Sequence, residues 1–375
     1  TPKYFEVKQV YAPMALKLNG NKLDVVLRDN MVEMQNYRLL YTITENGKVI
    51  KKGEIKELTV PSVKYNADAD VRLNISVQLK SDTKWAKAGF EVRHEQFAIN
   101  DKLSSAFKPA ALKTGRQADV KDAEEWFNAV KPHFYRAPMD NDKGFGNWIA
   151  KDWKNNRLDN PEVVTVKPLS SKRNADGTVT VAVTQECRYV NGKITADYVY
   201  TMDASGSVDF KAVYTQEGQL PPLPCVGNTF VLDKDLTQLS WYGMGQQDSY
   251  VDRLEATSIG RWTSSVPQEY VHYPRPQSSG NHEQTVTLSL TTAKGKGYTV
   301  TTADGKPFSF SALPYSEAQL STVAHDCDLQ AEDNVYLNID ARMMGLGNSS
   351  CGPGVLTKYS VPQEPHTLHL MFTRK

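Results

Sequence analysis

The sequence lacks several features that would each point to a class of protein. Its four cysteines are widely spaced and form no CxxC pair, so neither a zinc site nor a disulfide framework is indicated, and we expect free thiols. No apolar run approaches the length of a membrane span. Basic and acidic residues balance, at 44 and 43, without a long block of either sign. Nucleic acid and membrane are therefore not predicted as partners.

Strand-like segments are abundant instead, and 375 residues are more than one core usually serves. Short runs rich in Val, Leu, Ile and Tyr extend from Lys3 to about Ile99, and residues 23–27, 37–44 and 71–79 alternate or nearly alternate. Asn46-Gly47 between two such runs is a strong hairpin signal. This spacing of strands and turns predicts a β-sandwich.

The pattern breaks at about residue 100 and resumes from residue 163 to the end. Residues 100–130 are predicted to be a connecting segment with a short helix within 119–130. A second helix is expected within 315–324, with Ser316 as its N-cap. Turns are expected at four places between strands: Asp176-Gly177, Asn191-Gly192, Ala204-Ser205-Gly206 and Asp304-Gly305. One large sandwich is predicted for this part.

The run FYRAPMDNDKGFGNW, residues 134–148, fits no helix or strand period. Asp140, Asn141 and Asp142 are short polar side chains that favour a turn in which side chains bond the main chain. Arg136 is well placed to hold one carboxylate in a two-pronged pair. The residues alone leave three hypotheses open: a structural buckle, a metal loop or part of a sugar site.

Three further segments have unusual composition. YGMGQQDSYVDR, residues 242–253, predicts a tight turn and not a dinucleotide loop. Residues 262–281 interleave aromatic and polar side chains, which suits equally sugar recognition or a proline-stiffened loop packed against a neighbouring domain. GLGNSSCGPG, residues 345–354, must be a shaped loop, and no base adjoins its Cys351. No pair of carboxylates stands out as a glycosidase pair.

Taken together, these strings resemble a known family. FYRAPMDNDKG, YGMGQQDSYVDR, YVHYPRPQSSGN, FSFSALPYSEAQL and LNIDARMMGLGNSSCGP are similar, in this order, to the C-terminal region of the large β-galactosidases of glycoside hydrolase family 2. FEVKQVYAP and WAKAGFEVRHEQF resemble the domain before it. The resemblance implies an all-β fold: an immunoglobulin-like β-sandwich (residues 1–99), a linker (100–130) and a large antiparallel galactose-mutarotase-like supersandwich (131–375).

The resemblance also implies a function. In that family both catalytic glutamates belong to a (β/α)₈ barrel, and no alternation of strand and helix here would build one. We therefore expect a noncatalytic C-terminal part of a β-galactosidase, with a galactoside and the catalytic barrel as partners, a possible homo-oligomer, and no cofactor or metal in this chain. The alternatives are a stand-alone carbohydrate-binding protein and an epimerase with a histidine base and a carboxylate facing one sugar.

Site residues are carried over from the same resemblance. Cys351 aligns with a tryptophan that serves some members as an aromatic platform for the sugar, so it would give a small soft contact in place of a stacked ring. The residues expected at the substrate rim are Cys351, Asn348, Ser349 and Ser350, and those expected to fix the loop architecture are Arg136, Asp140, Asn141 and Asp142. A bacterial source is expected, with cytoplasm and periplasm both left open.

Overall fold

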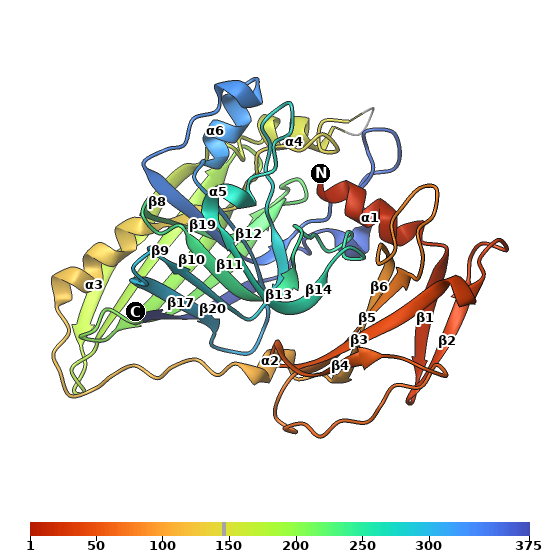
Figure 1. Ribbon diagram of the computed structural model, residues 1–375. Helices are drawn as coiled ribbons and strands as arrows, with labels where there is room; N and C mark the ends of the chain where they lie inside the picture. Colours follow the sequence, from red (N-terminus) through yellow and green to blue (C-terminus); the bar gives the residue numbers. More distant parts are fainter. Residues whose placement is uncertain (145–147) are drawn as a thin grey trace. The chain divides into compact units, whose positions relative to one another are not determined.

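The computed structural model describes residues 1–144 and 148–375, so three residues near the end of the 134–148 run, 145–147, lie outside the described residues. Strands dominate it (Figure 1), which confirms the all-β prediction. The chain divides into two compact units. The first contains Thr1–Phe107, Gly245–Gln247 and Leu254–Arg261, and the second contains Lys108–Met244, Asp248–Arg253 and Trp262–Lys375.

The first unit is a two-layer β-sandwich. One layer pairs two strands, and the other has four strands in the order β4-β3-β5-β6, all antiparallel. The strands are β1 (Met14–Asn19), β2 (Lys22–Leu27), β3 (Tyr37–Glu45), β4 (Lys48–Glu54), β5 (Val71–Leu79) and β6 (Glu91–Asn100). Alternate residues of β5, such as Leu73, Ile75 and Val77, point into a core shared with Met14 and Leu23 of the other layer. The predicted sandwich is confirmed.

The hairpin predicted at Asn46-Gly47 is also confirmed. These two residues connect β3 to β4, and Glu45 and Lys48 face each other across the turn. Both central residues have positive φ, 47° and 78°. That conformation is typical of the two-residue turns whose twist matches the flanking strands, and it explains why asparagine and glycine occupy them.

The prediction of strand-like structure from Lys3 was wrong for the first residues, which form helix α1 (Pro2–Val10). Pro2 sits at the first helical position, where its missing N–H costs nothing. Gln9 is buried, and its side-chain Nε2 donates to Nδ1 of His94 in β6 over 2.5 Å. This segment is therefore held by polar contacts to the sheet. The strand prediction relied on the alternation of apolar residues, which plays no part in these contacts.

The second unit consists of two antiparallel sheets around one large core, as predicted. The nine-stranded sheet has the order β14-β13-β16-β17-β20-β11-β10-β9-β8, and the five-stranded sheet has the order β15-β18-β19-β12-β7. The strands are β7 (Val130–His133), β8 (Glu162–Arg173), β9 (Val179–Tyr189), β10 (Gly192–Met202), β11 (Val208–Gly218), β12 (Cys225–Asp233), β13 (Gln238–Gly245), β14 (Ser258–Ser265), β15 (His282–Thr285), β16 (Thr287–Thr291), β17 (Gly297–Thr302), β18 (Phe308–Leu313), β19 (Asn334–Met343) and β20 (His366–Arg374).

Aromatic side chains fill the space between these two sheets. Phe210 of β11, Phe230 of β12 and Phe372 of β20 are buried and contact one another, and the ring of Trp126 lies over all three. Such large rings contribute most of the apolar area that a core removes from water. The four predicted turns lie between consecutive strands of this unit.

Both predicted helices are present in the second unit. Asp119 caps α3 (Val120–Trp126), and its carboxylate accepts from Lys121 N at 2.7 Å. Ser316 caps α6 (Glu317–Thr322), and its hydroxyl accepts from Gln319 N at 3.2 Å. The other helices are α2 (Leu103–Ala106), in the first unit, and α4 (Ile149–Asn155) and α5 (Val266–Glu269), in the second. Within the part of the chain that the structure describes, no helix is long and apolar enough to cross a membrane.

Candidate functional site

The two-pronged pair predicted for Arg136 is confirmed. Its Nη2 lies 2.9 Å from Oδ1 of Asp142, and its Nε lies 3.2 Å from Oδ2 of the same carboxylate. Both side chains are buried. Burial opposes the charge of the guanidinium, but Asp142 outweighs it and raises the pKa of Arg136. Asp142 also accepts from Met139 N at 2.9 Å, which closes the turn between them.

The same guanidinium holds a second loop. Arg136 Nη1 donates to the carbonyl of Met344 at 3.0 Å, and Nη2 donates to that of Gly345 at 3.3 Å. These carbonyls begin the glycine-rich loop that follows β19. One buried cation therefore ties residues 136–142 to a loop about 200 positions later in the sequence.

Asn141 and Gly144 make further contacts between these two loops. Asn141 Nδ2 donates to the carbonyl of Gly347 at 2.5 Å, and its Oδ1 accepts from the Ser350 hydroxyl at 2.6 Å. Gly144 lies so close to the backbone of Ser349 that a Cβ there would overlap the Ser349 carbonyl oxygen. Glycine is therefore required at position 144 by the close approach of the two backbones.

Asp252 brings in a third segment, residues 248–253. Its carboxylate accepts from Leu346 N at 2.9 Å and from Gly347 N at 2.8 Å. In the same segment Asp248 forms a buried ion pair with Arg253 at 2.5 Å. The sequence singled out no carboxylate pair, and the structure shows that Asp252 binds main chain and that Asp248 binds arginine.

Gln277 brings in the fourth segment, residues 275–281. Its Oε1 accepts from Asp140 N at 3.0 Å, and its Nε2 donates to Asp140 Oδ2 at 3.3 Å. We call the four segments 136–144, 248–253, 275–281 and 344–354 the four-loop cluster. An apolar core lies beneath it, formed by Met139, Cys225, Tyr250, Met343 and Leu346. Four of the strings singled out in the sequence thus meet at one place.

The outer loop of the cluster presents a mixed surface. Asn348 and Cys351 are exposed, Ser350 is half-buried, and Ser349 is buried against Gly144. The loop is closed by its own backbone, since Cys351 N donates to the Asn348 carbonyl at 3.0 Å. All four cysteines are free, as expected. An exposed amide and thiol are suited to contact a polar ligand.

The aromatic segment 262–281 is packed largely against its own unit. Tyr270 is buried, and its hydroxyl donates to Oδ1 of Asp326 at 3.0 Å. Oδ2 of the same aspartate lies 2.9 Å from His272 Nδ1. Glu269 lies 2.5 Å from the buried His282. These contacts all lie within the second unit, so they do not support the alternative of a loop packed against a neighbouring domain.

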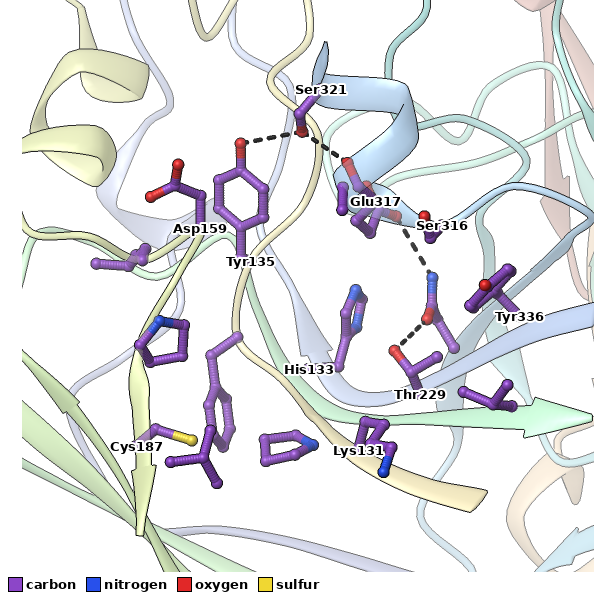
Figure 2. Close-up of a pocket in the computed structure, with 18 of the residues that line it drawn as sticks. Lys131, His133, Tyr135, Asp159, Cys187, Thr229, Ser316, Glu317, Ser321 and Tyr336 are labelled. Atoms are coloured by element: carbon purple, nitrogen blue, oxygen red, sulfur yellow. Dashed lines mark hydrogen bonds between the residues drawn. The ribbon is translucent and has the colours of Figure 1, made fainter. Parts of the chain in front are cut away.

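Sequence reasoning missed a pocket of about 360 Å³ beside α6, shown in Figure 2. Glu317 and Tyr135 line it, and burial raises the pKa of both, that of Tyr135 to about 12. Glu317 Oε2 accepts from Ala137 N at 2.5 Å, and the Tyr135 hydroxyl lies 3.1 Å from that of Ser321. Much of its polar lining is therefore already engaged within the protein.

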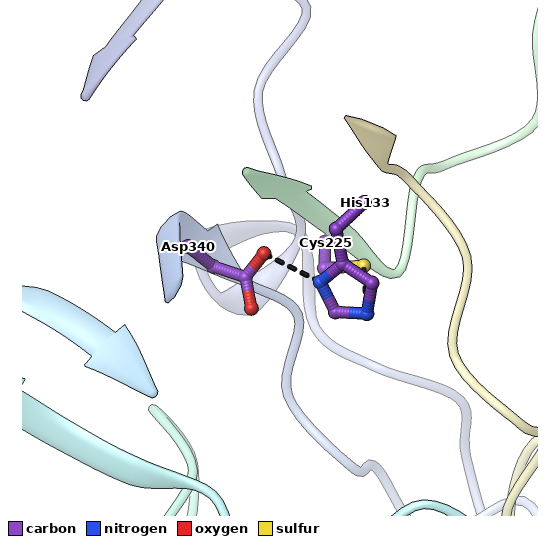
Figure 3. Close-up of side chains that lie close together, drawn as sticks. All are labelled: His133, Cys225 and Asp340. Carbon is purple, nitrogen blue, oxygen red and sulfur yellow. Dashed lines mark hydrogen bonds and ion pairs between the residues drawn. The ribbon is translucent and has the colours of Figure 1, made fainter. Parts of the chain in front are cut away.

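His133 reaches the same pocket from β7 and belongs to a buried row with Cys225 and Asp340 (Figure 3). Its Nδ1 lies 2.7 Å from Asp340 Oδ1, and its Nε2 lies 3.8 Å from Cys225 Sγ. Burial lowers the pKa of His133, but Asp340 and Cys225 outweigh it, so the pKa is raised well above the usual value.

The arrangement of this row limits its chemistry. The ligand atoms of the three residues lie within 4.8 Å of one another, close enough to suggest a metal ion. However, the two hydrogen bonds of His133 leave from opposite edges of its ring, so the imidazole already has a partner on each nitrogen.

Comparison with known proteins gives the family. The profile described as "Beta galactosidase small chain" matches residues 110–373, and "Beta-galactosidase, domain 4" matches residues 28–100. A β-galactosidase of Priestia megaterium is 25% identical over 394 residues, covering 92% of this chain and 37% of that protein. One from Streptococcus thermophilus is 26% identical, covering 92% and 36%. The chain thus spans less than half the length of these curated relatives.

Solved structures with some similarity are a putative aldose 1-epimerase from Escherichia coli K12 and a GalM/aldose epimerase homologue from C. elegans. The first has a TM-score of 0.28 at 12% identity and covers 56% of this chain and 69% of its own. The second has a TM-score of 0.27 at 12% identity and covers 82% and 95%. The family assignment depends on the sequence match, which spans most of the second unit: the chain belongs to the β-galactosidase small-chain family.

Proposed function

We propose that this chain is the noncatalytic C-terminal part of a β-galactosidase and that it shapes the rim of the site at which terminal β-D-galactosides are hydrolysed. The observation that carries this proposal is the four-loop cluster in a chain of this family. Its carboxylates at Asp142 and Asp252 are engaged by arginine or by backbone N–H groups. The cluster therefore offers shape and polar contacts, and we assign the bond-breaking groups to the catalytic region of the complete enzyme.

Within the cluster we assign two kinds of role. Arg136, Asp140, Asn141 and Asp142 fix the loop architecture, which their hydrogen bonds to the neighbouring loops support. Asn348, Ser349, Ser350 and Cys351 form the substrate rim. The exposure of Asn348 and Cys351 supports this role. Ser349 is buried, so it would contribute by holding the backbone of the rim in place.

The partners follow from the same proposal. The curated relatives are more than twice as long as the matched part, which supports a catalytic region as the first partner and a galactoside as the second. We further propose the division into residues 1–99, a connecting segment 100–130, and residues 131–375, which the two profile matches support. Assembly into a homo-oligomer stays a prediction that sedimentation would check. Family membership disfavours the stand-alone carbohydrate-binding alternative.

The experiment is an assay of a chromogenic β-galactoside with two samples: the purified 375-residue chain, and the complete β-galactosidase that carries it. We expect turnover from the complete enzyme and none from the chain. Turnover by the chain, after purification from a host without its own β-galactosidase, would refute the proposal. An Asn348→Ala variant of the complete enzyme should raise KM more than it lowers kcat, because a rim residue contributes to binding more than to the chemical step.

A further inference from the structure

His133, Cys225 and Asp340 come together from three strands of the five-stranded sheet, β7, β12 and β19 (Figure 3). All three side chains are buried. They bring together an imidazole, a thiol and a carboxylate, which are the side-chain groups that bind Zn²⁺ in proteins. Sequence spacing did not indicate this grouping, because His133 lies 92 positions from Cys225 and 207 positions from Asp340.

The two contacts of the His133 ring differ in strength. Nδ1 lies 2.7 Å from Oδ1 of Asp340, which is a short contact to a carboxylate. Nε2 lies 3.8 Å from Sγ of Cys225, and a thiol is a weak hydrogen-bonding group. The strong contact fixes the orientation of the ring, with Nε2 on the side of the sulfur. A metal ion that binds Nε2 therefore has to replace only the weak contact.

The distance from Nε2 to Sγ is close to the distance between two ligands of one zinc ion. Zinc binds nitrogen at about 2.0–2.1 Å and sulfur at about 2.3 Å in a tetrahedral site, which places the two ligand atoms about 3.6 Å apart. The observed 3.8 Å differs from this by about 0.2 Å. An ion therefore fits between the two atoms with little movement of β7 or β12.

Asp340 supplies a second, independent observation. Its side chain is buried, and Oδ2 has no hydrogen-bond partner among the residues that the structure describes. A buried polar atom of this kind is typical of a place where an ion or a ligand binds. The carboxylate and a Cys225 thiolate together carry two negative charges, which one divalent ion would balance in the buried site. A carboxylate behind a metal-binding histidine is also the common arrangement in proteins.

The pocket of Figure 2 gives an ion access to these groups. His133 is one of its lining residues, so an ion that enters the pocket of about 360 Å³ meets the imidazole. Two side chains supply two of the four positions around a tetrahedral zinc ion. The pocket has room for the water molecules that would fill the other two.

We propose that Nε2 of His133 and Sγ of Cys225 bind a Zn²⁺ ion and that Asp340 is the positioning residue that orients the histidine. The ion replaces the thiol proton of Cys225 and any proton on Nε2, and these protons pass to the solvent without electron transfer. The inference does not depend on the function proposed above, because it requires neither a galactoside nor the catalytic region.

Cobalt titration tests the inference, because Co²⁺ can occupy zinc sites and a cobalt–thiolate bond gives an absorption band in the near ultraviolet. The parent is the 375-residue chain in which the exposed Cys327 and Cys351 are replaced by serine. We expect one equivalent of Co²⁺ to produce the band and Zn²⁺ to abolish it. Cys225→Ser should give no band, whereas Cys187→Ser, which removes the other buried thiol, should behave as the parent does. A band that persists in Cys225→Ser, or a parent without a band, would overturn the inference.

X-ray absorption at the zinc edge needs only the parent chain, so it decides the question even if Cys225→Ser does not fold. We expect one sulfur at about 2.3 Å from the zinc and at least one nitrogen at about 2.0 Å. A shell that contains oxygen and nitrogen but no sulfur would mean adventitious binding at the surface, and the proposed site would be wrong.

Asp340→Asn tests the positioning role. The amide oxygen can still accept from Nδ1 but carries no charge, so the affinity for Zn²⁺ should fall about 10–100-fold in competition with a chelator. The cobalt–thiolate band should remain, because both ligands are retained. An unchanged affinity would overturn the role assigned to Asp340. Galactoside turnover by the isolated chain would contradict the proposed function and would leave the zinc site untouched.

Discussion

Arg136 is the residue on which the four-loop cluster depends most. It is fully buried, and its charge is balanced by Asp142, while its remaining donors bond the carbonyls of Met344 and Gly345. A buried ion pair adds little net stability when compared with an apolar replacement of both partners. Removal of one partner is different, because the other charge is left buried without compensation.

We therefore predict that Arg136→Met lowers the free energy of unfolding by roughly 3–5 kcal/mol, because Asp142 is left unpaired in the interior. Urea denaturation followed by tryptophan fluorescence measures the loss. Lys167→Met is the matched control, because its pair with Asp197 is exposed and 3.9 Å long, and it should cost less than about 1 kcal/mol. Equal losses in the two variants would contradict the central role of Arg136.

Glu283 gives a prediction about pH. Burial raises its pKa from 4.5 to about 7, although Asn281 and Ser309 donate hydrogen bonds to it. Below pH 4.5 the carboxyl is protonated in the folded and the unfolded chain alike. Between pH 4.5 and 7 the unfolded chain releases the proton while the folded chain keeps it, so stability falls as pH rises. Above pH 7 the loss is constant, at roughly 3 kcal/mol.

Glu283→Gln should remove this loss, because the amide keeps an acceptor oxygen and carries no charge. The variant and the parent should be similar in urea denaturation at pH 4.5, and the variant should gain roughly 2–3 kcal/mol on the parent by pH 8. The pH 4.5 measurement serves as the control for any packing change. A difference that does not vary with pH would contradict the raised pKa.

The residue contacts differ in how far sequence could predict them. The pair of Arg136 and Asp142 lies within one short string, so local turn chemistry was enough to anticipate it. The contact of Asp252 with Gly347 joins residues 95 positions apart, and that of His133 with Asp340 spans 207 positions. Such contacts depend on the strand order of the sheets, which no local pattern contains.

At the scale of elements, β12 shows how one glycine sets a side-chain row. Gly227 pairs with His133 of β7 on one side and with Asp340 of β19 on the other. The absence of a side chain between them allows the imidazole and the carboxylate to meet across the strand. A Cβ at this position would overlap the Ile339 carbonyl oxygen and the Asp340 carboxylate.

Gly227→Ala is accordingly predicted to destabilise the second unit by about 2 kcal/mol or more, because the core cannot accept the added methyl group without backbone shifts. Thermal unfolding should show the loss as a lower midpoint. Gly352→Ala is the control, since its added Cβ would come no closer than 3.3 Å to Asn348. If the midpoint for Gly227→Ala matched that of the control, β12 would be able to shift and accept the methyl group, which would contradict the prediction.

Elements with a local signature were predicted from sequence, and others were not. The caps at Asp119 and Ser316 and the Asn46-Gly47 turn located two helices and a hairpin. Helix α1 was not predicted, because its apolar residues do not pack into a core. Their spacing therefore resembled that of a strand. The order of the strands in each sheet could not be predicted either, because strands far apart in sequence lie side by side. For example, β20 lies between β11 and β17.

For the whole molecule, the proposed rim leads to a prediction about substrate binding. In the complete enzyme, Cys351→Trp should lower KM for a galactoside by about threefold to tenfold, because a ring supplies a stacking face that a thiol lacks. Cys351→Ala should change KM less than about twofold, because only a small contact is lost. Steady-state kinetics on both variants checks this. If neither variant changed KM, Cys351 would not belong to the substrate rim.

The placement of β20 has a consequence for how the protein is made. Residues 366–374 follow all the other strands of the nine-stranded sheet in sequence, yet they lie in its interior, bonded to β11 on one side and β17 on the other. Until they leave the ribosome, the sheet exists as two halves with open edges that can pair with other nascent chains. The nine-stranded sheet therefore cannot close before residue 374 has left the ribosome, and stalled translation just before residue 366 should yield aggregates that chaperones have to hold.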